Sequence, residues 1–176
     1  REELARFDPD IGDLVYRGWI GKPVYVEHKN LDYTKAIGAV VDVSMRKIEN
    51  SEGDIWKVIA LMAIDRTKNR AIAEDILAGR RKTYSMGALV KAYQCSVCKA
   101  VGEIRPGMKD KYEALPCGKQ HAYVDRLGGF REFPTANGGR TIGFTNALRV
   151  KPFEISSVGY PAFASAYTSE IEIKGL

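Results

Sequence analysis

The chain has 176 residues with a formal net charge of +5, and 45% of its residues are hydrophobic. This length predicts a single domain, residues 1–176, that can bury a core without disulfides. No apolar run approaches the roughly 18 residues of a membrane-spanning helix. The charged N-terminal segment, residues 1–10, lacks the apolar core of a signal peptide. The first residue is Arg rather than Met, so we expect a shortened or processed form.

Positive charge is scattered along the chain. The 27 Lys and Arg outnumber the 22 Asp and Glu, and one dense cluster, GRRK, spans Gly79–Lys82. Aromatic residues do not alternate with these cations, as they do in single-strand binders, so nucleic-acid binding is not favoured. A solvated surface is the simplest interpretation of the charge, and an acidic partner or substrate is the functional one.

The first part of the chain has apolar segments separated by polar turns. β-Branched and apolar runs predict two short strands in residues 13–28, around Gly21 and Lys22, and longer strands in 36–48 and 54–65, with a turn at 49–54. Residues 66–79 then change period. Their apolar side chains share one helical face and a glycine follows, which predicts a helix with Gly79 as its C-terminal cap.

Later segments return to strand patterns around an irregular region. Strands are predicted in residues 82–94 and 150–163, the second closed by Pro161, and the last nine residues are an edge strand or disordered. Between these strands, residues 95–140 are rich in Gly, Pro and Lys and hold all three cysteines. We expect a mainly β fold with a few helices (α+β), a barrel or sandwich with a metal-binding subdomain inserted at 93–125.

The three cysteines and one histidine form a metal-ligand pattern. Cys95 and Cys98 are separated by two residues, and Cys117 precedes His121 by four positions. Such C-x2-C and C-x3-H pairs can complete a tetrahedral zinc site, and four protein ligands leave no open position for catalysis. The odd number of cysteines also argues against a disulfide framework. The pattern predicts a structural Zn²⁺ that stabilises the inserted segment.

The other histidine, His28, ends the apolar segment PVYV and is then the one imidazole free for proton transfer. Ser85 begins an apolar strand and is followed by Gly87, a combination that suits either a turn or a nucleophile. It does not form the G-x-S-x-G elbow of the α/β-hydrolases, since position 83 is Thr. A half-buried hydrogen-bonding role for His28 stays open at this point.

Three segments resemble one known family. KPVYVEHKNLDYTKAIGAVVDV, TYSMGAL and FEISSVGYPAF together resemble the prohead (procapsid) maturation proteases of tailed phages, relatives of herpesvirus assemblin. The resemblance covers about residues 16–165 and matches His28, the IGAV of Ile37–Val40, Ser85 with Gly87, and Phe153–Ala162. It implies an assemblin-like β-barrel core.

The resemblance also implies a mechanism, with Ser85 as nucleophile and His28 as general base. Glu154 takes the place of the second histidine that assemblin uses, and Asp65 and Asp32 are the alternatives. Backbone N–H groups near Gly159 and Tyr160 are implied as the oxyanion hole. Relatives often cut after Glu, so a basic subsite from Arg80, Arg81 and Lys82 is one interpretation of the GRRK cluster, and an exposed turn is the other.

The implied substrates are phage scaffold and capsid proteins, cut inside the viral prohead in the host cytoplasm. Self-cleavage and a homo-oligomer are further expectations, and a membrane partner is not expected. Two alternatives remain. One is a zinc-ribbon module that binds nucleic acid or protein without catalysis, and the other is a capsid-associated protein that keeps the fold but has lost activity.

Overall fold

A computed structural model describes residues 3–10, 12–47, 56–122, 131–134 and 138–160. Strands predominate, which confirms the mainly β class. The elements are β1 (Phe7–Asp8), β2 (Asp13–Leu14), the 3-10 helix η1 (Val15–Trp19), β3 (Pro23–Val26), the 3-10 helix η2 (Tyr33–Lys35), β4 (Gly38–Lys47), β5 (Trp56–Ile64), α1 (Arg70–Leu77), β6 (Tyr84–Cys95), β7 (Val101–Glu103), β8 (Glu132–Pro134), β9 (Arg140–Ile142) and β10 (Thr145–Ser157).

The chain divides into two compact units. The first takes the described residues of Arg1–Leu89 together with those from Lys151 onward, and the second is Val90–Val150. The second unit begins and ends outside the predicted insertion at 93–125, because the distal parts of β6 and β10 belong to it. Two short hairpin pairings lie in it, β6 with β7 and β8 with β9.

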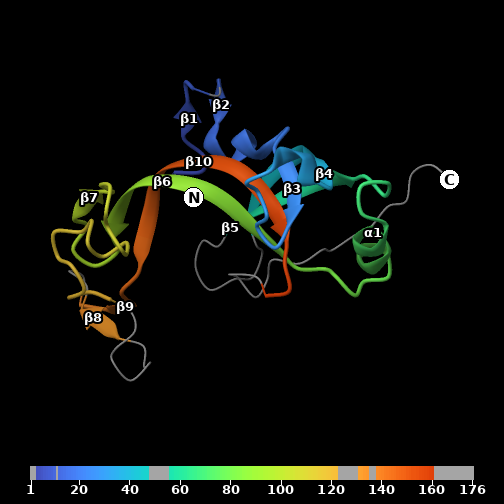
Figure 1. Cartoon of the computed structure of the whole chain (residues 1–176). Helices are drawn as coiled ribbons and strands as arrows, with labels where there is room; N and C mark the ends of the chain where they lie inside the picture. The colour runs from blue at the N-terminus through green and yellow to red at the C-terminus, as the bar shows by residue number, and fades with distance from the viewer. Residues whose placement is uncertain (1–2, 11, 48–55, 123–130, 135–137, 161–176) are drawn as a thin grey trace. The chain divides into compact units, whose positions relative to one another are not determined.

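A six-stranded sheet runs in the order β5-β4-β3-β10-β6-β7 (Figure 1). β3 pairs in parallel with β10, with Val24 opposite Ile155 and Val26 opposite Ser157, and antiparallel with β4. Among the described strands this sheet is open. The closed barrel that the family resemblance implies is therefore corrected: β7 pairs only with Ala92–Gln94 near the end of β6, and the described pairings form no ring.

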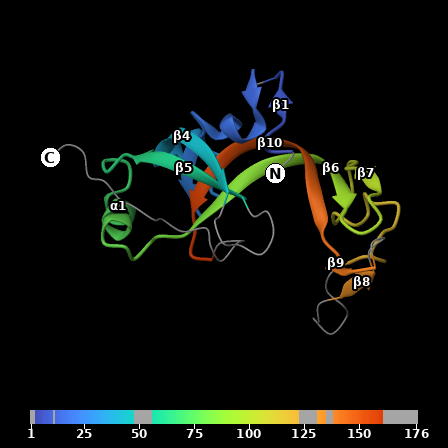
Figure 2. The ribbon, with the colours of Figure 1, turned by 180° about the vertical axis from the view of Figure 1, so that it is seen from behind.

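The core of the first unit lies on one face of this sheet. Its buried members include Val24 and Ile155, which are register partners on adjacent strands, and Ile76 of α1. α1 connects β5 to β6, as the reverse view shows (Figure 2). Tyr25 and Glu154 alternate with these core residues and so belong to the opposite face, where both are nevertheless buried.

Most predicted elements of the first unit are confirmed. β4 and β5 fall inside the predicted strands, and β6 ends at Cys95, one residue past its predicted end. α1 ends before Gly79, whose φ of +67° suits a glycine C-terminal cap. The predicted first strand is wrong, because residues 15–19 form η1. The turn at 49–54, Pro161 and the C-terminal nine residues lie outside the described residues. No described helix is long and apolar enough to cross a membrane.

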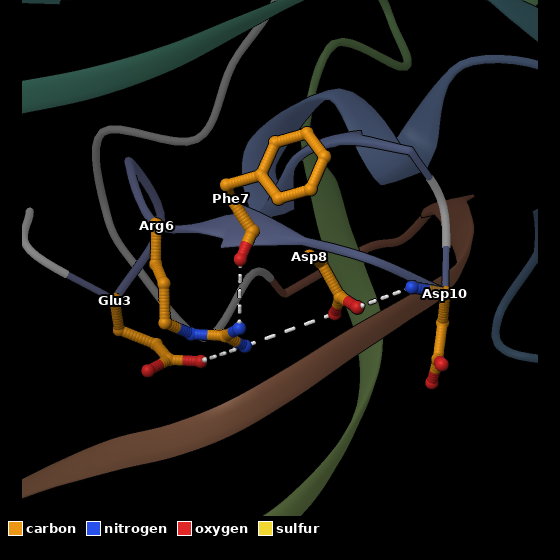
Figure 3. Close-up of polar contacts among 5 residues, drawn as sticks. All are labelled: Glu3, Arg6, Phe7, Asp8 and Asp10. Carbon is orange, nitrogen blue, oxygen red and sulfur yellow. Dashed lines mark hydrogen bonds and ion pairs between the residues drawn. The ribbon is translucent and has the colours of Figure 1, made fainter.

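A small hairpin, β1 with β2, precedes η1 (Figure 3). The Arg6 guanidinium lies 3.2 Å from Glu3 Oε1 and 3.7 Å from Asp8 Oδ2, and it also donates to the Phe7 carbonyl. Asp8 accepts a bond from the Asp10 N–H, which forms the turn of the hairpin. These contacts are exposed, so they order the segment locally and add little stability.

Candidate functional site

His28, which follows β3, forms a hydrogen bond with Glu154 on the neighbouring strand β10. His28 Nδ1 lies 2.7 Å from Glu154 Oε1, although the two residues are 126 positions apart. The Glu154 side chain is fully buried, whereas 45% of the His28 side chain is exposed. A carboxylate at Nδ1 holds the neutral ring as the Nδ1–H tautomer, which leaves Nε2 with the free lone pair. The arrangement therefore suits a general base that takes a proton at Nε2.

The second carboxylate oxygen and the backbone carbonyl of Glu154 are also bonded. Ser156 Oγ donates to Oε2 at 2.5 Å, and the Trp19 indole N–H donates to the Glu154 backbone carbonyl at 3.2 Å. The pKa of the nearby Tyr25 phenol is raised, first by burial and then by the negative charges of Glu154 and Asp32. A buried carboxylate with this many donors is held in one position.

Gly87 lies against the Glu154 carboxylate. A Cβ added at Gly87 would lie 2.7 Å from Glu154 Cγ and closer still to Oε1, so a side chain does not fit there. The Val158 N–H donates to the Thr83 carbonyl at 3.0 Å. Thr83 therefore lies opposite Val158, and Gly87 lies opposite Glu154. Residue numbers rise along β6 as they fall along β10, so the two strands are antiparallel and Ser85 lies opposite Ser156.

Ser85 thus shares a sheet face with the pair. Side chains two apart on a strand point to the same face, so Ser85 and Gly87 lie on the side that carries Glu154 and Ser156. Ser85 is partly exposed. Within the described residues, no hydrogen bond joins its hydroxyl to the His28 ring. Catalytic hydrogen bonds often form only when substrate binds.

The alternative carboxylates are used in local turns. Asp32 accepts from the side chain and backbone N–H of Thr34, and Asp65 accepts from those of Thr67. In each case the hydrogen bonds, the threonine hydroxyl first, lower the pKa of the carboxyl group. Glu154 alone of the three candidates contacts His28 in the described structure.

The implied oxyanion and basic subsites have internal partners. The Gly159 N–H donates to Glu27 Oε1 at 3.0 Å, and the same oxygen pairs with Arg81. Arg80 pairs with Asp75. Tyr160 is almost fully exposed. The GRRK cluster is therefore not exposed throughout, because only 18% of the Arg81 side chain is accessible to solvent.

In the second unit, the four predicted metal ligands lie together. The ligand atoms of Cys95, Cys98, Cys117 and His121 are all within 4.8 Å of one another, and Cys95 Sγ is 3.4 Å from His121 Nδ1. Lys99, with φ of 60°, turns the chain so that its N–H donates to the Cys95 carbonyl. Three sulfurs and one imidazole at these separations can hold a metal ion.

The side chains of this cluster have different surroundings. Burial first, and then the neighbouring thiols, raise the pKa of Cys117 to about 12, whereas a backbone hydrogen bond near Ala100 contributes most to lowering that of Cys98. The His121 ring packs edge-on against Phe133, with centroids 5.2 Å apart. A Cβ at Gly143 would lie 2.7 Å from the Phe133 ring, so this glycine lets the chain pass close to the site.

Sequence reasoning missed the structural roles of Glu27, Ser156, Phe133 and Gly143. Ser156 lies two residues after Glu154, and that E-x-S spacing on a strand was a usable signal for a same-face donor. The others depend on contacts between distant segments and left no local pattern. Searches against protein-family models, curated proteins and solved structures find no match to this chain.

Proposed function

We propose that this chain is a serine endopeptidase of the prohead maturation type, with Ser85 as nucleophile, His28 as general base and Glu154 as the group that orients the imidazole. The observation that carries the proposal is the bond from His28 Nδ1 to the buried Glu154 carboxylate. A buried carboxylate is costly unless it is paired, so one placed beneath a half-exposed histidine implies a use for both.

In this mechanism the Ser85 hydroxyl attacks the scissile carbonyl while His28 Nε2 accepts its proton. The imidazolium then donates that proton to the leaving amine, and water hydrolyses the acyl-enzyme with the same base. Glu154 stabilises the positive ring electrostatically and keeps Nδ1 protonated. The E-x-S pair on β10 and the glycine on β6 support this role, because they fix the carboxylate without supplying a competing cation.

The proposed substrates are scaffold and capsid proteins of a tailed phage, cut inside the prohead within the host cytoplasm, together with the chain itself. A homo-oligomer belongs to the same proposal. The family resemblance in His28, Ser85 and the Phe153–Ala162 segment supports these partners. An acidic substrate is also consistent with the net charge of +5.

Ser85→Ala is the direct test. We expect wild-type protein to cleave itself or a scaffold segment, and the variant to lose at least about a thousandfold of that rate, as other enzymes do without their nucleophile. Peptide mapping by mass spectrometry reads the cleaved bonds. Ser44→Ala, at another partly buried strand serine, should cleave normally. Undiminished cleavage by Ser85→Ala would remove Ser85 from the role.

We further propose that the Cys95, Cys98, Cys117 and His121 cluster holds a structural Zn²⁺. The soft donor set and the four protein ligands fit zinc, which would fix the fold of the second unit. Metal analysis should give about one equivalent of zinc per chain. His28→Ala should leave this content unchanged, and a fully folded metal-free protein would contradict the assignment.

A binding module without catalysis is the second candidate. The metal cluster favours it, because all four ligands lie in the second unit, apart from His28 and Glu154 in the first. It predicts tight, salt-dependent nucleic-acid binding or protein binding that survives Ser85→Ala. It gives no reason for the buried carboxylate at His28.

A further inference from the structure

The backbone of Glu27 and His28 is unusual. Both are non-glycine residues in the left-handed region, with φ of 49° and 55°. Such a conformation is unfavourable for residues with a Cβ, and two in succession persist only where their surroundings hold them. Three backbone hydrogen bonds contribute, from the Glu27 N–H to Ser157, from Lys29 to Val26 and from Asn30 to His28.

This turn brings the imidazole to Glu154. β3 and β10 are parallel, with Val26 opposite Ser157, so an extended β3 would carry residue 28 level with residue 159. Residue 159 is five residues beyond Glu154, or about 16 Å along the strand. This distance is longer than a histidine side chain. The left-handed pair turns the chain back and closes this distance to a hydrogen bond of 2.7 Å.

The Glu27 side chain fastens the turn to two other segments. Its Oε1 accepts the Gly159 N–H at 3.0 Å, just past the end of β10, and pairs with the Arg81 guanidinium. Arg81 Nε in turn donates to Ser157 Oγ at 3.1 Å. The Arg81 backbone N–H bonds to the Asp75 carbonyl, so the contact is anchored at the end of α1. We call Glu27 and Arg81 the clamp.

We propose that the clamp residues Glu27 and Arg81 are positioning residues that hold His28 in the orientation its catalytic role requires. This inference rests on the proposed peptidase function. Neither residue takes part in proton transfer. Arg81 is charge-matched by Glu27, which removes it from the basic subsite considered for an acidic substrate.

Two activity measurements test the clamp. Glu27→Ala removes both contacts of Oε1, and we expect kcat to fall about 10- to 100-fold with KM changed less than threefold. Glu27→Gln keeps an acceptor for the Gly159 N–H and should recover part of the loss. Arg81→Met keeps the aliphatic stem but not the charge and should resemble Glu27→Ala. The matched controls Glu74→Ala and Arg70→Ala break an exposed ion pair on α1, and both should cleave like wild type.

A second readout does not depend on activity. In the Ser85→Ala background, the His28 Nδ1–H resonance should be visible by ¹⁵N-edited NMR because Glu154 accepts it. Adding Glu27→Ala or Arg81→Met should broaden or abolish it through exchange, whereas Arg70→Ala should not. A retained resonance together with unchanged kcat in both clamp variants overturns the proposal. If no cleavage is found in wild type but the resonance still depends on the clamp, the peptidase function fails while the positioning role stands.

Discussion

At the scale of single residues, the site depends on one buried negative charge. Glu154 is fully buried and is bonded to His28, Ser156 and, through its backbone, Trp19. Removing one of these donors would leave a buried oxygen without a hydrogen-bond partner, which is costly. Gly87 also matters, since it leaves the space that the carboxylate fills.

Gly87→Ala should therefore displace the carboxylate. The added methyl group would overlap Glu154 Cγ and Oε1, so we expect a loss of about 1–3 kcal/mol in the free energy of unfolding and loss of cleavage. Urea unfolding followed by tryptophan fluorescence measures the first, and peptide mapping the second.

The control for stability is Gly159→Ala, where the nearest atom to the new Cβ would be a Glu27 oxygen at 3.9 Å, an ordinary contact. This variant should unfold within about 0.5 kcal/mol of wild type. A Gly87→Ala protein that is as stable and active as wild type would show that the close packing against Glu154 is not required.

Residue types and spacing were enough to predict the four metal ligands as a cluster and to mark His28 and Ser85 as candidates, whereas Glu154 was named only through the family resemblance. They were not enough to predict how His28 reaches Glu154. The left-handed pair contains no glycine, so nothing in the local sequence marks it. The contacts that hold it come from residues 54 and 132 positions away, at Arg81 and Gly159.

At the scale of elements, three neighbouring strands arrange the site. β10 lies between β3 and β6, so it brings the segment before His28 next to the strand that carries Ser85. The strand patterns located β3 and β6 closely, whereas β10 begins at Thr145 and ends at Ser157, both earlier than in the predicted strand at 150–163. The pattern failed at η1, where Val15 and Trp19 are both buried at a spacing of four, which fits a helical turn as well as a strand.

Metal removal should lower hydrogen-exchange protection in the second unit and not in the first. We expect chelation to increase hydrogen exchange at amides in Cys95–His121, because the proposed ion would supply folding free energy to this segment. Amides of β4 and β5, which belong to the first unit and its apolar core, should keep their protection. Hydrogen-exchange mass spectrometry with and without chelator measures both.

Equal loss of protection in β4 and β5 would mean that the metal cluster stabilises the whole chain rather than the second unit. No change anywhere would mean that the four side chains hold no ion that matters for folding. Cys98→Ser, which removes one ligand from the exposed side of the cluster, should resemble chelation.

At the scale of the whole molecule, fold class was predictable and closure of the sheet was not. Hydrophobic patterns predict where strands lie in the sequence but not which strands pair, because pairing depends on segments far apart in sequence. The second unit, Val90–Val150, is also longer than the insertion predicted at 93–125. β6 and β10 continue across its boundaries as regular strands, so no Gly- or Pro-rich linker marks where it begins.

The central claim is that His28, held by Glu154, activates the Ser85 hydroxyl. Labelling with a fluorophosphonate probe, followed by mass spectrometry of the modified peptide, tests it most directly, because such probes react with activated serines. The account predicts one adduct on Ser85 that His28→Ala abolishes and Ser44→Ala leaves intact. An unlabelled Ser85 in protein that still cleaves its substrate, or labelling of Ser85 that persists without His28, would contradict it.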